Sequence, residues 1–236
     1  MSLRSSLISL AVLFSTSLPE NTFASPGATA NVVLSCSSLL YCGNVGDSAS
    51  HSFPPTSSPD GEKMSIDHDT WVREDEEERL SKAGAFLHPS PPPFKLASFA
   101  PVKILYTLAF GCPRVYKADA RGNVVGGLNM TRSIGDVQLK PQVSHDPDVT
   151  LKECEVGEFV VTATDGVWDE LSPAEVGALI KAAEQSTQKN HVDLPPCEGV
   201  ARAASLIVNE AIKRGGRDNA TAIVAKRCQL RSSPTR

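Results

Sequence analysis

The sequence predicts a mixed α+β fold, in which antiparallel sheets rich in hairpins are covered by helices. Short apolar runs typical of strands alternate with longer segments that have one apolar helical face, in the order strand, strand, helix, strand, helix, strand. The chain of 236 residues has 41% hydrophobic and 21% charged residues, which suits one globular domain or a large part of one.

The first predicted element is a hairpin over residues 32–45, in which two apolar runs flank Ser35-Cys36-Ser37-Ser38. Residues 51–63 have the proline, serine and Asp-Gly content of a loop. A short charged helix is predicted over residues 73–86, ending near Gly84. Its acidic residues lie in the first turn, where the helix dipole favours them.

Residues 88–112 differ in composition from the segments on either side. They are rich in proline at first and then apolar with almost no charge, and they have neither a clear period nor helix caps. We expect either an inserted loop or a stretch that does not belong to the domain.

The signals after residue 157 are clearer. Residues 158–164 form an apolar, β-branched run that predicts a buried strand. A helix follows, with Ser172 as its N-cap, Pro173 at its first position and Glu175 completing a capping box. Its predicted apolar face consists of Val176, Leu179, Ile180 and Ala183.

A second helix is predicted over residues 199–214, where Gly215-Gly216 ends it. A turn at Asp218-Asn219 then leads into a final strand over residues 221–225. The residues of the second helix expected to face the core are Ala203, Ile207, Val208 and Ala211.

Charge and cysteine content narrow the classes of function. The 23 basic and 27 acidic residues give a net charge of -4, so no global basic surface is available for nucleic acid. The six cysteines include no C-x-x-C pair, and we interpret them as reduced thiols, although their even number permits disulfides. They are Cys36, Cys42, Cys112, Cys154, Cys197 and Cys228.

The first thirty residues have the outline of a secretory signal peptide: Arg4, an apolar stretch over residues 7–14, and small residues at 28–30. The alternative is an amphipathic helix that leads into the domain. The apolar stretch is shorter than the roughly 18 residues that a transmembrane helix needs, so no transmembrane segment is predicted. We expect a cytoplasmic or nuclear protein, with the secretory route as the alternative.

Three aspartates lie where predicted strands begin or end: Asp47, Asp165 and Asp218. If those strands are neighbours, the carboxylates converge at one edge and offer the oxygen ligands that Mg²⁺ or Mn²⁺ prefers. Asp169, four residues after Asp165, could reach the same place. The alternative is that each aspartate only forms a turn, a common role for Asp-Gly and Asp-Asn.

Four strings around these aspartates resemble motifs of the metal-dependent protein serine/threonine phosphatases of type 2C, the PPM-type family. They are "NVGDS" (residues 44–48), "MTRSIGD" (130–136), "TDGVWDELS" (164–172) and "RGGRDNAT" (214–221). The segment over residues 65–87 also resembles the family's aspartate-histidine segment and the helix after it. The resemblance implies a four-layer α-β-β-α sandwich of two antiparallel sheets flanked by helices.

The resemblance also implies the chemistry of the site. Two or more Mn²⁺ or Mg²⁺ ions would hold a water that attacks the phosphorus of a phosphoserine or phosphothreonine in a protein substrate. Asp165 and Asp218 would be ligands of one core metal, and Asp47, with Asp165 and Asp169, would lie at a weaker third-metal position. Residues near the substrate-side flap would be Thr131, Arg132 and Asp136. For Trp168 we expect a packing role at the turn from strand to helix.

The resemblance begins near residue 30, so residues 1–30 are an atypical N-terminal segment and 31–228 a partial phosphatase domain, with the insert at 88–112 and a tail at 229–236. The first strands and the family's Asp-Gly-His segment are missing from the 236 residues, and no general-acid histidine is found. Ala49 stands where the family usually has Arg.

Because the Asp-Gly-His segment is missing, a non-catalytic binding module is the alternative function. We expect a monomer, although the sequence does not determine the oligomeric state.

Overall fold

The computed structural model describes residues 26–56, 60–69, 74–88, 114–118, 122–189 and 198–228. The predicted insert and tail lie almost wholly outside these residues, as does most of the N-terminal segment. The chain divides into two compact units. The first unit comprises Met1–Ala30, Gly43–Asp47 and Asp67–Asp148, and the second unit comprises Asn31–Cys42, Ser48–Ile66 and Val149–Arg236.

The second unit contains one four-stranded sheet and most of a three-stranded sheet. The four-stranded sheet has the order β12 (Ala222–Lys226), β11 (Phe159–Ala163), β4 (Ala49–Phe53) and β5 (Glu62–Lys63), and every pair in it is antiparallel. The three-stranded sheet has the order β10 (Asp148–Glu153), β3 (Leu39–Val45) and β2 (Ala30–Cys36). The predicted hairpin over residues 32–45 corresponds to β2 and β3.

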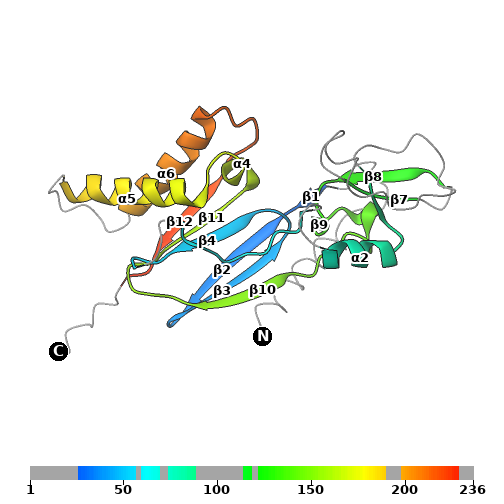
Figure 1. Ribbon diagram of the computed structural model, residues 1–236, viewed down its shortest axis with the longest axis horizontal. Coiled ribbons are helices and arrows are strands. Elements are labelled where there is room, and N and C mark those ends of the chain that lie inside the picture. Colours follow the sequence, from blue (N-terminus) through cyan, green and yellow to red (C-terminus); the bar gives the residue numbers. More distant parts are fainter. Residues whose placement is uncertain are drawn as a thin grey trace. The chain divides into compact units, whose positions relative to one another are not determined.

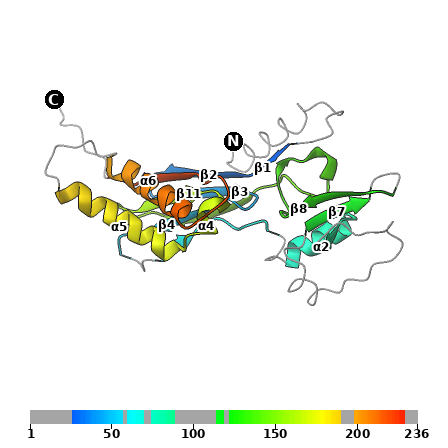
Figure 2. The ribbon, with the colours of Figure 1, turned by 90° about the horizontal axis from the view of Figure 1, so that it is seen from above.

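Two long helices, α5 (Pro173–Lys189) and α6 (Glu198–Lys213), cover one face of the four-stranded sheet (Figure 1). Their apolar side chains form one core with those of β4 and β11, and Figure 2 shows the same arrangement from above. The buried helix residues are Val176, Ile180 and Ala183 of α5 and Ala203, Ile207 and Ala211 of α6. The predicted apolar faces are thus confirmed, except that Leu179 and Val208 are only half-buried.

The opposite face of the four-stranded sheet packs on the three-stranded sheet. Their shared core contains Leu40, Cys42, Met64, Cys154 and Val160. Side chains alternate along a strand, and on β10 Thr150 and Lys152 are half-buried while Val149 and Leu151 are exposed. Val32 and Leu34 of β2 are exposed as well. The expected fold class, antiparallel sheets packed face to face with helices outside, is confirmed.

The first unit is built around α2 (Glu74–Lys82) and an antiparallel sheet of the order β6 (Phe86–His88), β7 (Arg114–Ala118) and β8 (Val124–Leu128). Its core consists of Leu80, Ala85, Val115, Leu139 and Val143. A second, two-stranded sheet pairs β1 (Gly27–Ala28) with β9 (Ile134–Gly135), and η1 (Val137–Leu139) follows it.

One predicted loop is partly wrong, because its first residues belong to the buried strand β4. The sequence of β4 is "ASHSF", which lacks the β-branched residues typical of strands. Its serines are tolerated in the interior because they are paired: the Ser50 hydroxyl lies 2.7 Å from the Thr162 hydroxyl and donates to Asn31 Oδ1 at 2.5 Å. The predicted helix over residues 73–86 ends earlier, at Lys82.

The four cysteines within the described residues, Cys36, Cys42, Cys154 and Cys228, are free thiols. None of the helices that the structure describes combines the length and apolar character needed to cross a membrane.

Candidate metal centre

Two acidic loops of the second unit lie side by side. Asp165 is the first residue of α4 (Asp165–Trp168), which Thr164 joins to the end of β11, and Asp218 lies in the loop before β12. Thr164 joins the loops, because its hydroxyl donates to the carbonyl of Asn219 at 3.2 Å and accepts from the N–H of Thr221 at 3.1 Å. Its own N–H donates to the carbonyl of Thr221 at 3.1 Å. The predicted convergence of these two strand ends is therefore present.

Gly166 allows the close approach of the two loops. A Cβ at this position would lie 2.6 Å from the carbonyl oxygen of Asn219, which is backbone and cannot turn away as a side chain would. Any larger residue at this position would clash with the backbone of Asn219, so glycine is required for steric reasons and not for its φ angle.

The two carboxylates have similar surroundings. Asp165 Oδ1 accepts the N–H of Gly166 at 2.9 Å, and Asp218 Oδ1 accepts the N–H of Asn219 at 2.7 Å. Asp165 is half-buried and Asp218 is exposed, so solvent reaches both side chains. Each aspartate does form a turn, as the alternative predicted, but the two turns are adjacent and present their carboxylates at the same edge.

Trp168 packs behind this edge, as expected. Its indole N–H lies within hydrogen-bonding distance of the carbonyls of Ala49 (3.1 Å) and Ala163 (3.2 Å), and its ring centroid is 4.4 Å from that of His51. Asp169 is exposed at the C-terminal end of α4, where its N–H donates to the carbonyl of Asp165 at 2.8 Å.

The remaining predicted site residues belong to the first unit. Asp47 is half-buried, while Thr131 and Asp136 are buried. The Thr131 hydroxyl donates to the carbonyl of His68 at 3.1 Å. Asp136 has a left-handed backbone (φ 47°), and its N–H donates to the carbonyl of Pro26 at 3.1 Å. The predicted residues therefore fall into two groups: one around Asp165 in the second unit, and one around Asp47 and residues 131–136 in the first.

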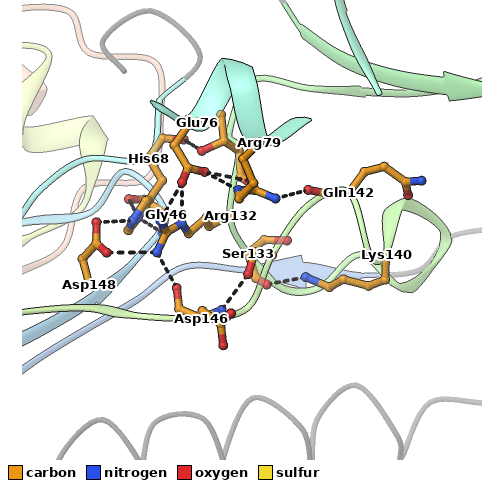
Figure 3. Close-up of polar contacts among 12 residues, drawn as sticks. Gly46, His68, Glu76, Arg79, Arg132, Ser133, Lys140, Gln142, Asp146 and Asp148 are labelled. Atoms are coloured by element: carbon orange, nitrogen blue, oxygen red, sulfur yellow. Dashed lines mark hydrogen bonds and ion pairs between the residues drawn. The ribbon is translucent and has the colours of Figure 1, made fainter. Parts of the chain in front are cut away.

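The guanidinium of Arg132 is held in a polar network (Figure 3). It donates to Glu76 Oε1 from Nη2 at 2.6 Å and from Nε at 3.0 Å, and its Nη1 donates to Asp148 Oδ1 at 3.0 Å. Sequence reasoning did not find Glu76 or Asp148 as partners, since they are 56 and 16 residues away from Arg132 in the chain.

Burial and hydrogen bonding act in opposite directions on Glu76. Burial raises the pKa of its carboxyl, but hydrogen bonds from Arg132, Arg79 and Thr131 outweigh burial and lower the pKa to about 2.

Lys140 is the second ionisable group of the first unit with a strongly shifted pKa. Burial lowers the pKa of Lys140 to about 8, and its Nζ donates to the carbonyl of Ser133 at 2.7 Å.

The carboxylates of Asp165 and Asp218 suit a hard divalent cation in chemical type, because such cations prefer oxygen ligands. Two carboxylates are too few to hold a cation by themselves. Across the described ranges, no group of three or more His, Cys, Asp or Glu side chains is arranged to hold a metal ion. A cation at this edge would need further oxygen ligands.

Comparison with known proteins gives consistent matches. The family model described as protein phosphatase 2C matches residues 108–220, which include "MTRSIGD", "TDGVWDELS" and nearly all of "RGGRDNAT". Protein phosphatase 2C 7 of Arabidopsis thaliana is 32% identical over 206 residues, covering 84% of this chain and 34% of its own length. The chain spans about a third of the length of that curated relative.

Solved structures show the same fold. A C. elegans sex determining protein superposes with a TM-score of 0.68 at 23% identity, covering 94% of this chain and 45% of that one. The catalytic domain of a serine/threonine protein phosphatase, solved in complex with two manganese ions, has a TM-score of 0.53 at 17% identity and covers 96% of this chain and 69% of that one. These comparisons do not support the alternative of a non-catalytic binding module.

Proposed function

We propose that this chain, which belongs to the protein phosphatase 2C family, acts as a protein serine/threonine phosphatase on phosphorylated protein substrates. The observation that supports this function best is the contact between the loops of Asp165 and Asp218, which Thr164 and Gly166 bring together. These are the two strings whose acids the family resemblance assigns to one core metal.

In this proposal, Asp165 and Asp218 supply carboxylate oxygens to Mn²⁺ or Mg²⁺. Two like charges at one edge repel each other, and a divalent cation would relieve that repulsion. When bound, such cations lower the pKa of a water and neutralise charge on a phosphoryl group, so no covalent phospho-enzyme is needed. Asp169 and Asp47 are the further acidic ligands that the resemblance predicts.

The other residues of the site position these acids. Thr164 fixes the spacing of the two loops through three hydrogen bonds. Trp168 anchors α4 from behind, through two backbone carbonyls. Thr131, Arg132 and Asp136 are proposed to lie near the substrate, although the contacts of Arg132 with Glu76 and Asp148 already occupy its guanidinium. We therefore assign Arg132 to holding this segment in place.

The proposal is tested by the metal dependence of phosphate release from a phosphothreonine peptide. Turnover should require Mn²⁺ or Mg²⁺ and stop in excess chelator. Asp165→Asn and Asp218→Asn should each reduce turnover by more than the roughly 10- to 100-fold that losing an outer-shell partner costs. Both variants keep an oxygen that can accept the N–H of the next residue, so the turns themselves should survive.

Glu153→Gln is the matched control, since Glu153 is an exposed acid of β10 in the same unit. It should leave turnover unchanged. Mn²⁺ titration calorimetry on the same variants measures cation binding independently of turnover. Turnover that persists in chelator, or Mn²⁺ affinity that is the same with and without Asp165→Asn, would contradict the proposal.

A further inference from the structure

The loop that carries Asp218 is held against α4 at both of its ends. After Asp218, the carbonyl of Asn219 accepts the hydroxyl of Thr164 at 3.2 Å, and Thr164 immediately precedes α4. Before Asp218, Arg214 Nη1 donates to the carbonyl of Glu170 at 3.1 Å, and Glu170 lies just beyond the other end of α4. The loop and α4 therefore lie side by side between two contacts, all within the second unit.

The chain after α6 packs closely on Glu170 at the second of these contacts. Gly215 has a φ of 97°, and its N–H donates to the carbonyl of Ile212 at 3.0 Å, which ends α6 in a left-handed turn. A Cβ at Gly216 would lie 3.0 Å from Cγ of Glu170 and 3.1 Å from the carbonyl oxygen of Ala211. The backbone two residues before Asp218 thus lies directly against Glu170.

The guanidinium of Arg214 is also bound on its other sides. Its Nη2 lies 2.7 Å from Glu175 Oε1, and its Nε donates to Glu210 Oε1 at 3.4 Å. Glu175 Oε2 accepts the N–H and the hydroxyl of Ser172, at 2.9 and 2.7 Å. Hydrogen bonds from Arg214 and Ser172 lower the pKa of Glu175 to about 2, so this ion pair persists at neutral pH. The planar donor group of Arg214 therefore joins the end of α6 to the start of α5 and to the end of α4.

We propose that Arg214 is a positioning residue for the candidate metal centre: by tying the start of the Asp218 loop to the carbonyl after α4, it sets the separation of the carboxylates of Asp218 and Asp165. Each carboxylate is oriented by the N–H of the residue after it, at 2.7 and 2.9 Å. Arg214 holds the two segments together on the side away from Thr164. This inference rests on the proposed function, because it takes both acids as ligands of one cation. The alternative is a surface ion pair that only stabilises α5 and α6.

The direction of the change in Mn²⁺ affinity separates these roles. Arg214→Leu removes a positive charge four residues from Asp218, and this change in charge alone should strengthen the binding of a cation. Loss of the contact with Glu170 should instead weaken Mn²⁺ binding about 10-fold, the lower end of the cost of an outer-shell partner. Titration calorimetry on the full chain measures this affinity. An unchanged or higher affinity in Arg214→Leu would overturn the inference.

Lys213→Gln is the matched control for charge. Lys213 precedes Arg214, is exposed, and pairs at the surface with Glu210 at 3.6 Å. Its substitution removes the same charge at the same end of α6 but leaves the contact between Arg214 and Glu170 in place, so Mn²⁺ affinity should not fall. A loss equal to that of Arg214→Leu would show that charge, and not the contact, determines the affinity.

Glu175→Gln is the matched control for stability. It removes the charge of the ion pair while Arg214 keeps its hydrogen bond to the backbone of Glu170. Mn²⁺ affinity should stay at the wild-type value even if the melting temperature falls. Equal losses of affinity in Glu175→Gln and Arg214→Leu, or affinities that simply follow the melting temperature, would mean that Arg214 has only a structural role.

Nuclear magnetic resonance tests the geometry without any metal. The N–H groups of Asn219 and Gly166 donate to the carboxylates of Asp218 and Asp165, so their signals report on these two acids. Arg214→Leu should shift the Asn219 signal, while the amide signals of β11 and β12 stay in place. An unshifted Asn219 signal would overturn the inference.

Asp165→Asn distinguishes a failure of this inference from a failure of the proposed function. If Asp165→Asn binds Mn²⁺ like the wild type, the proposed function fails and the positioning role of Arg214 fails with it. If Asp165→Asn loses Mn²⁺ while Arg214→Leu does not, only the positioning role fails.

Discussion

Glu76 shows how a single residue departs from its sequence pattern. The acids at the start of α2 suggest a solvated first turn that complements the helix dipole, and Glu74 and Asp75 are indeed exposed. Glu76 instead points inward, is 1% exposed, and binds both Arg79 and Arg132. Arg79 is three residues away and was within reach of helix periodicity, but Arg132 was not, because nothing local links it to α2.

We predict that Glu76→Gln lowers the free energy of unfolding at pH 7 by about 3 kcal/mol, since breaking a buried ion pair leaves charges without a partner. The pKa of Glu76 falls from 4.5 to about 2 on folding, so its stabilisation is complete above pH 4.5 and disappears as the pH falls toward 2. Urea unfolding between pH 7 and pH 3 should show a steeper loss of stability in the wild type than in Glu76→Gln.

Glu78→Gln is the control for this prediction. Glu78 lies on the same helix, is exposed, and pairs only at the surface with Lys82 at 2.7 Å. Its removal should leave the unfolding curve nearly unchanged. If both variants behave alike, the network around Glu76 does not contribute to stability.

At the scale of elements, local signals were reliable where the stabilising contacts are themselves local. The capping box of α5 forms as predicted: the Ser172 N–H donates to Glu175 Oε2 at 2.9 Å, and the Glu175 N–H donates to the Ser172 hydroxyl at 3.4 Å. Strand β4 was missed for the opposite reason. Its serines are buried only because β11 and β5 flank it, and this tertiary context is invisible in "ASHSF".

Removing the cap should destabilise α5 measurably. Ser172→Ala should lower the free energy of unfolding by about 1 kcal/mol, because the first turn loses its side-chain acceptor. Ser205→Ala in α6 is the control: its hydroxyl bonds back to the carbonyl of Ala201 within an exposed helix interior, where alanine is the better helix former. Chemical denaturation should show a loss for the first variant and no loss, or a small gain, for the second.

At the scale of the whole molecule, the sequence predicted which strand ends carry acids, because strands and their flanking turns are read locally. That Asp165 and Asp218 share one edge follows from the pairing of β11 with β12, which the sequence left open. The polar network around Arg132 could not be predicted, because Glu76 and Asp148 lie far from Arg132 in the chain. Among the described residues, one face of the three-stranded sheet carries exposed apolar side chains.

That face provides the last prediction. Val32 and Leu34 of β2 and Val149 and Leu151 of β10 point away from the inner core, and Leu34 and Leu151 are 49% and 57% exposed. Exposed apolar patches of this kind promote association and dye binding. The double substitution Leu34→Thr with Leu151→Thr should reduce the fluorescence of a bound hydrophobic dye and reduce self-association in sedimentation, with little change in stability.

Val161→Thr is the control, because Val161 lies in the core beneath α5 and α6. It should lower the free energy of unfolding by about 1–3 kcal/mol, since it buries a hydroxyl. Equal destabilisation by the surface pair would mean that this face is packed in solution.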